Sequence, residues 1–165
     1  MIDETVEEIE QMQTQSASVV AVRAAEALRE LTDREYPTVG EFLRDLERNS
    51  SALRRANTSH APLFTSQRRI LDAVTDPEPD TVETAKARLV EAIEEVVDEV
   101  EANKTDAGER AAALIDDGDV LLTHENSSTV MAAFDAALAS GATFDVYVTE
   151  ARPRLLGRKT ARELA

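Results

Sequence analysis

The spacing of apolar residues changes near residue 116, and this change limits the fold more than any other feature of the sequence. Up to that point, apolar side chains recur three and four residues apart, which is the period of an amphipathic α-helix. Beyond it, short apolar and β-branched runs alternate with helical stretches. The sequence therefore predicts a helical N-terminal domain at residues 1–116 and the beginning of an α/β domain at residues 117–165.

Five helices are predicted in the first domain. They cover residues 3–13, 16–31, 38–51, 62–74 and 80–100. Capping side chains are expected at Ser16 or Ser18, at Thr38 and at Asp80. An extension of the third helix through residue 55 is the alternative to an end at residues 49–51. Because aromatic residues make up only 4% of the chain, we expect a core of Ala, Val, Leu and Ile.

Four elements are predicted in the second domain, in the order strand, helix, strand, helix. They cover residues 120–124, 127–139, 144–149 and 159–165. This order predicts parallel strands joined by a right-handed crossover, and the first strand is expected to be buried. Two parallel strands alone do not make a stable sheet, so we expect the sequence to be part of a longer chain. The alternative is that another chain supplies the rest of the sheet.

The charge of the chain indicates its surroundings. The formal charge is −15, from 33 acidic and 18 basic residues, and only Lys86, Lys104 and Lys159 are lysines. Such a surface suits a high-salt cytoplasm, where screening reduces self-repulsion, and an ordinary acidic protein is the alternative. Direct binding of nucleic acid is not expected, because contacts to phosphates need a basic face.

Several classes of site and location are disfavoured by composition. The chain has no Cys, and His60 and His124 are too far apart in sequence to suggest a metal site. A metal is therefore not expected. No glycine-rich nucleotide-binding motif occurs, so a nucleotide cofactor is not expected either. The acidic N-terminus is unlike a signal peptide, and no apolar run is long enough to span a membrane. We therefore expect a cytoplasmic protein that does not bind membranes.

A hydroxyl cluster marks the place where the first strand gives way to a helix. Ser127, Ser128 and Thr129 stand where backbone N–H groups at a helix start attract phosphate, so they are candidates for binding a phosphorylated ligand. The alternative is that one of them only caps the helix.

Polar residues also follow both predicted strands. His124 and Glu125 come at the end of the first strand, and Glu150 and Arg152 follow the second, so all four are candidates to line one crevice. Glu150 and Arg152 are expected to pair and to order their loop, with a mechanism that uses paired carboxylates as the alternative. The basic stretch at residues 152–162 fits a phosphate, an acidic partner or a solvated helix face.

Three blocks of the second domain carry a resemblance to a known family. The blocks are Gly118–His124, Val146–Pro153 and Gly157–Ala161. They resemble the alpha, beta and delta subunits of initiation factor 2B, together with ribose-1,5-bisphosphate isomerase and methylthioribose-1-phosphate isomerase of the same family. Residues 12–28 and 56–71 resemble the helical domain of that family. The resemblance implies a Rossmann-like domain that begins at residue 117 and continues beyond residue 165.

The departures from the isomerases are informative. A Cys follows the Thr-His pair in those enzymes, and Glu125 stands there in this chain. Their Arg-Gly-Ala segment corresponds to Gln15-Ser16-Ala17, and a second Arg corresponds to Asn57. The resemblance places their catalytic Asp beyond Ala165, and only Ser127–Thr129 falls where they grip a phosphate. Loss of the Cys and of two Arg removes proton transfer and most of the charge that holds a bisphosphate.

The resemblance thus implies a subunit-like protein with a regulatory or protein-binding role in translation initiation and no catalytic residue. The alternative is a sugar-phosphate isomerase of the ribose-1,5-bisphosphate type that acts in nucleoside and AMP metabolism. A helical protein without retained activity is a third reading. Implied partners are a second copy, bound through the Rossmann-like domain, and initiation factor 2. Implied ligands are a sugar phosphate or a nucleoside monophosphate.

Overall fold

The protein is mainly helical, with one short parallel sheet. The computed structural model describes residues 2–11 and 16–165, so the predicted positions Met12, Gln13 and Gln15 lie outside the described residues. The chain divides into two compact units, Met1–Val100 and Glu101–Ala165, which are described separately. The predicted domain boundary between residues 116 and 117 stays a prediction.

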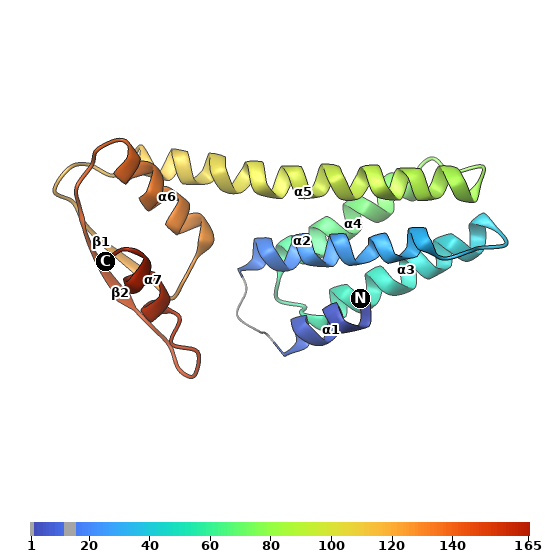
Figure 1. Ribbon diagram of the computed structural model, residues 1–165, viewed down its shortest axis with the longest axis horizontal. Coiled ribbons are helices and arrows are strands. Elements are labelled where there is room, and N and C mark those ends of the chain that lie inside the picture. The colour runs from blue at the N-terminus through green and yellow to red at the C-terminus, as the bar shows by residue number, and fades with distance from the viewer. Residues whose placement is uncertain (1, 12–15) are drawn as a thin grey trace. The chain divides into compact units, whose positions relative to one another are not determined.

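The first unit consists of helices (Figure 1). Its elements are α1 (Ile2–Glu10), α2 (Ala17–Ala27), the 3-10 helix η1 (Leu28–Asp33), α3 (Val39–Ala56), α4 (Ala61–Thr75) and the first part of α5 (Val82–Ala112). α4 packs against both α2 and α3, and α1 packs against α2 and α3. The predicted caps at Ser16 and Thr38 are confirmed, since their hydroxyl oxygens accept the N–H groups of Val19 and Glu41.

Aliphatic side chains fill most of the core of this unit, as predicted. The largest fully buried apolar residues are Leu28, Leu31, Phe42, Leu46, Leu53, Leu63, Ile70, Val74, Leu89 and Ile93. Burying one such side chain contributes about 1.5–3 kcal/mol. The aromatic exception is Phe42, whose ring meets the ring of Tyr36 edge-on, with centroids 5.1 Å apart.

Several predictions for the first unit are wrong. The helix predicted at residues 16–31 divides into α2 and η1, and the helix predicted at residues 80–100 continues to Ala112. α3 does not end at residues 49–51, and the alternative is confirmed, since the helix runs to Ala56 and Leu53 is fully buried. Asp80 does not cap α5. The hydroxyl oxygen of Thr81 accepts the N–H of Thr84 at 3.1 Å and satisfies the first turn instead.

The second unit contains the predicted strand–helix–strand–helix order. Its elements are the end of α5, β1 (Val120–His124), α6 (Ser128–Ala139), β2 (Asp145–Thr149) and α7 (Gly157–Glu163). The two strands pair in parallel, as predicted, from Val120 opposite Asp145 to His124 opposite Thr149. α7 begins two residues earlier than predicted and ends at Glu163, before the end of the chain.

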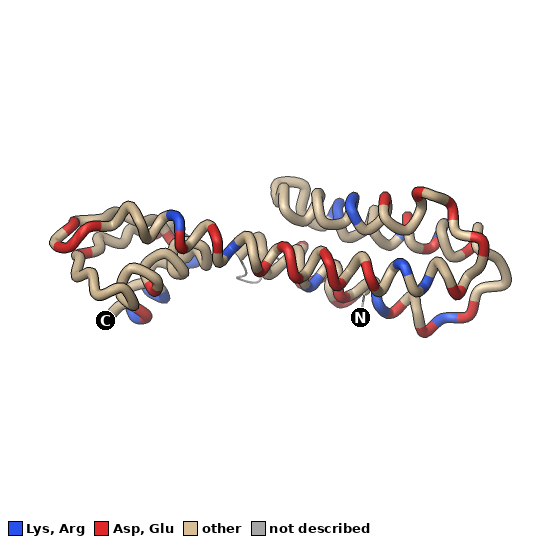
Figure 2. Tube along the Cα trace, turned by 90° about the horizontal axis from the view of Figure 1, so that it is seen from above, with Lys and Arg blue, Asp and Glu red and all other residues tan. Residues whose placement is uncertain are grey.

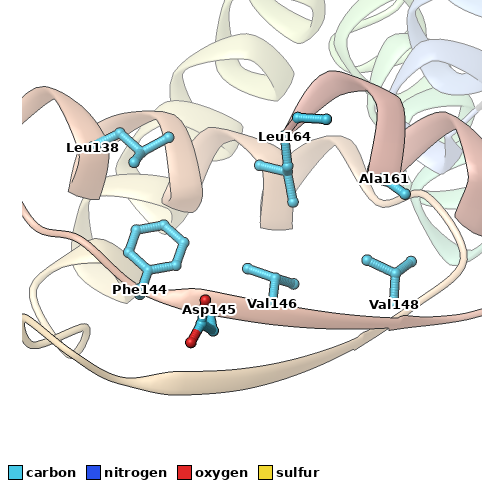
Figure 3. A pocket seen from close by; sticks show the side chains of 8 residues that line it. Leu138, Phe144, Asp145, Val146, Val148, Ala161 and Leu164 are labelled. Carbon is cyan, nitrogen blue, oxygen red and sulfur yellow. The ribbon is translucent and has the colours of Figure 1, made fainter.

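One face of the sheet is covered and the other is exposed. Val146 and Val148 of β2 point toward α6 and α7 and line a groove of about 280 Å³ with Leu138 and Leu164 (Figure 3). On the opposite face, Val120, Leu122 and Tyr147 are 64%, 75% and 67% exposed. The prediction that the first strand, β1, is buried is therefore wrong for this face.

Two glycines permit close packing in the second unit. A Cβ at Gly157 would lie 2.8 Å from the carbonyl oxygen of Thr149, so only glycine allows α7 to start this close to β2. A Cβ at Gly108 of α5 would lie 2.8 Å from the Cβ of Ala132 in α6. The sheet and its helices are thus held together by backbone proximity as well as by side chains.

Acidic residues are spread along the described helices and turns, with basic residues among them (Figure 2). Some are paired: Arg23 with Glu8 at 2.8 Å, and Arg29 with Glu94 at 3.5 Å. Exposed pairs of this kind contribute about 0.2–1 kcal/mol each. Within residues 2–11 and 16–165, no helix has both the length and the apolar character needed to cross a membrane.

Candidate functional site at the ends of the strands

The parallel register places the ends of β1 and β2 next to each other. His124 lies opposite Thr149, and the backbone N–H of Glu125 donates to the carbonyl oxygen of Thr149 at 2.8 Å. The hydroxyl of Thr149 donates to the carbonyl oxygen of Thr123 and lies 2.9 Å from Nδ1 of His124. Which of the two atoms donates in the second contact depends on the tautomer of His124. His124 and Thr149 thus connect the ends of the two strands.

The Glu125 side chain connects β1 to the loop that follows β2. Its Oε1 accepts the backbone N–H of Ala151, and its Oε2 accepts the backbone N–H of Leu156 at 2.9 Å. Glu125 has a φ of 60°, in the left-handed region that side chains other than glycine rarely adopt. Its carboxylate is therefore held between the two ends of the loop at residues 151–156.

A buried hydroxyl completes these connections. Thr160 of α7, only 1% exposed, donates to the carbonyl oxygen of Glu125 at 2.8 Å and accepts from Nδ2 of Asn126 at 2.9 Å. Sequence reasoning missed Asn126, Thr149 and Thr160 as site residues. Thr149 and Thr160 lie in the sequence blocks that carry the family resemblance, which is the signal that could have found them.

The hydroxyl cluster lies at the start of α6. Ser127 is the N-cap, and its Oγ accepts the N–H of Val130 at 3.4 Å. Ser128 and Thr129 are half-buried, and Ser128 is the first residue of the helix. The capping alternative is thus present at Ser127. A role of the three residues in phosphate binding stays a prediction.

The prediction that Glu150 pairs with Arg152 is wrong, because Glu150 pairs with Arg158. Oε1 of Glu150 lies 3.3 Å from Nε of Arg158, which α7 brings back toward the end of β2. Within the described part of the chain, neither Arg152 nor Arg154 forms an ion pair, and both are exposed. His124, Glu125 and Glu150 therefore gather at the strand ends, whereas Arg152 belongs to the exposed part of the loop.

Asn57, which stands where the isomerases have an Arg, takes part in a local turn of the helical unit. Oδ1 of Asn57 accepts the N–H of Ser59 at 3.1 Å and its hydroxyl at 2.7 Å, which closes the connection between α3 and α4. Ser16 caps α2, and its predicted neighbour Gln15 lies outside the described residues. Asn57 and Ser16 thus act as turn and cap residues.

Comparisons with known proteins identify relatives of this arrangement. The model of the family described as the initiation factor 2 subunit family matches residues 13–165. Ribose 1,5-bisphosphate isomerase of Haloterrigena turkmenica is 31% identical over 163 residues, which are 97% of this chain and 48% of that protein. The chain spans about half the length of the curated relatives that it matches.

Solved structures have the same fold. Translation initiation factor eIF-2B of Pyrococcus horikoshii is 27% identical with a TM-score of 0.77, over 99% of this chain and 55% of that one. A chain of the tetrameric eIF2B-beta2-delta2 complex of C. thermophilum has a TM-score of 0.77 and 22% identity, over 98% of this chain and 56% of that one. Because the C. thermophilum chain is only 22% identical, its similarity shows a common fold and nothing more.

Proposed function

The chain belongs to the initiation factor 2 subunit family, and from this premise we propose that it is a non-catalytic member that acts by binding other proteins in translation initiation. The observation that supports this proposal is the state of Glu125. In the isomerases that the sequence resembles, this position is a Cys. Here a carboxylate stands in its place, and both of its oxygens accept backbone N–H groups. A carboxylate fixed in this way does not replace a thiol in proton transfer.

The helical unit supports the same proposal. A bisphosphate needs cationic side chains, of which Arg is the most effective because it binds phosphate oxygens in pairs. Asn57 stands where the isomerases have one of these Arg, and its side chain is used in its own turn. Gln15 stands where they have another. A neutral side chain at both positions leaves a bisphosphate without these two counter-charges.

The proposal extends to architecture and partners. β1, α6, β2 and α7 form the first units of a Rossmann-like domain that begins at residue 117, and a second copy binds through this domain. Initiation factor 2 is the partner proposed in translation, and the cytoplasm of a cell with high internal salt is the proposed location. The charge of −15 supports the last point, since such a surface is tolerated best where salt screens it.

A sugar-phosphate isomerase is the second candidate. The names of the haloarchaeal relatives favour it, since those from Haloterrigena turkmenica and Haloferax volcanii are ribose 1,5-bisphosphate isomerases. In this case Ser127, Ser128 and Thr129 bind a phosphate at the start of α6. His124, whose exposed ring lies at the end of β1, is then the candidate general base.

A turnover assay and a binding assay together separate the two candidates. The full-length gene product is incubated with ribose 1,5-bisphosphate in molar KCl, and formation of the ketose is followed by NMR. A second sample is used to capture purified initiation factor 2 from the same solution. We expect no ketose and retention of the factor. Turnover that is lost in His124→Ala would support the isomerase instead and contradict the proposed function.

A further inference from the structure

The loop after β2 turns its backbone N–H groups toward a single carboxylate. We infer that the loop at residues 151–156 is a binding site for an oxyanion, and that Glu125 fills this site from within the chain. The ligand class is a group with two or more oxygens that share a negative charge, which means a carboxylate or a phosphate. This inference does not depend on the proposed function, because it concerns what the loop binds and not whether the protein is an enzyme.

The geometry of the donors supports a built site. The N–H groups of Ala151 and Leu156 are five residues apart in the sequence, yet each binds a different oxygen of the same carboxylate. Between them, the N–H of Leu155 donates to the carbonyl oxygen of Ala151 at 3.0 Å and closes the turn. The two donors are thus fixed by the loop's own backbone and converge on one point, as in other backbone sites for anions.

The conformation of Glu125 indicates that its carboxylate is held in place by the loop. Glu125 has a φ of 60° and Leu155 a φ of 53°, and both are unfavourable for residues with a side chain. The hydrogen bonds to the loop offset this cost only while the carboxylate occupies the site. Thr160 holds the Glu125 backbone from the other side through its carbonyl oxygen, at 2.8 Å.

The charges around the loop also favour an anion. Arg152 and Arg154 belong to the loop, are exposed, and form no ion pair with any residue that the structure describes. Arg158 is paired with Glu150 at 3.3 Å. The loop therefore carries two cations that are not used in ion pairs with described residues, and Glu125 is the carboxylate that the loop amides bind. Removal of its charge leaves the donors and two cations for an external oxyanion of similar shape.

Chemical rescue of Glu125→Ala tests this inference. The thermal midpoint is measured in molar KCl, and part of the salt is then replaced by potassium formate or potassium phosphate at constant ionic strength. We expect the variant to melt below the wild type and to recover about 3–5 °C, saturably, at ten times the dissociation constant of the anion. Formate and phosphate in separate arms show whether the site takes a carboxylate, a phosphate or both.

Glu150→Ala is the matched control, because it removes a carboxylate next to the same loop without freeing an amide. The wild type and this control should respond to both anions equally, through the general effect of the salt alone. A response of Glu125→Ala no larger than theirs would overturn the inference, as would saturable binding by the wild type with shifts of the Ala151 and Leu156 amide signals. If Glu125→Ala does not fold in KCl, refolding in formate or phosphate supports the inference, and failure in every salt contradicts it.

Discussion

The helical unit, Met1–Val100, and the α/β unit, Glu101–Ala165, are stabilised in different ways. In the helical unit, large aliphatic side chains from η1, α3, α4 and α5 are fully buried in one core. In the α/β unit, one face of the sheet exposes Val120, Leu122 and Tyr147, and single contacts of Gly157, Glu125 and Thr160 fix the elements. Stability in the first unit therefore comes mainly from buried apolar area. In the second unit it comes from a smaller apolar layer around Phe134, together with specific contacts to the backbone.

A matched pair of leucines should show the largest difference. Leu46 in α3 is fully buried, whereas Leu122 in β1 is 75% exposed. We expect Leu46→Ala to lower the free energy of unfolding by about 2–5 kcal/mol, because it removes buried area and leaves a cavity. Leu122→Ala should change it by less than about 0.5 kcal/mol. Chemical denaturation of both variants checks this, and equal losses would contradict the comparison.

Substitution of Gly157, at the start of α7, should have the second-largest effect on stability. Gly157→Val places side-chain atoms against the carbonyl oxygen of Thr149 and the Cβ of Glu150, both under 3.0 Å from the added Cβ. We expect a loss of about 1–3 kcal/mol, confined to the α/β unit. Gly40→Ala in α3 is the control, since its Cβ would meet only the end of the Arg44 side chain at 3.5 Å. Hydrogen exchange should show faster opening of β2 in the first variant and no loss in the second.

The carboxylate of Glu30 should make the stability of the helical unit depend on pH. A hydrogen bond from Arg34, and then one from the backbone N–H of Ile2, lower the pKa of Glu30 from 4.5 to about 2. Because the folded pKa is the lower one, the stabilisation is present above pH 4.5 and is lost as the pH falls through 2. Glu30→Gln should cost about 1 kcal/mol at neutral pH, after allowance for solvent screening, and nothing near the low end of that window. A constant difference across this range would contradict the assignment.

The smallest effect is expected at an exposed ion pair. Arg23 lies 2.8 Å from Glu8, and both side chains are well exposed. Arg23→Ala should cost about 0.2–1 kcal/mol in dilute buffer and less in molar KCl, where salt screens the pair. Unfolding curves at the two salt concentrations measure the difference. A cost that grows with salt would show that Arg23 contributes through packing.

The regular elements could be predicted from the sequence, because periodicity depends on neighbours along the chain. β1, α6 and the parallel pairing agree with the prediction, and Ser16 and Thr38 cap helices as expected. The exposed face of the sheet could not be read from the pattern, since an apolar run does not reveal what covers it.

Contacts across long sequence distances were the part that could not be predicted. Glu125 reaches amides 26 and 31 residues away, and the partner of Glu150 is Arg158 and not Arg152. Both depend on where α7 returns to β2, and Gly157 sets that approach through a backbone contact. Charge alone pointed to Arg152, which is closer in sequence, whereas geometry selected Arg158.

Calorimetric titration of the full-length gene product with ribose 1,5-bisphosphate and with AMP, in molar KCl, tests the central claim most directly. We expect no saturable heat with either ligand, because Glu125 is held by the loop and Asn57 and Gln15 supply no counter-charge. Saturable binding that weakens when Ser127 and Ser128 are replaced by Ala would contradict the claim and identify a working phosphate site at the start of α6.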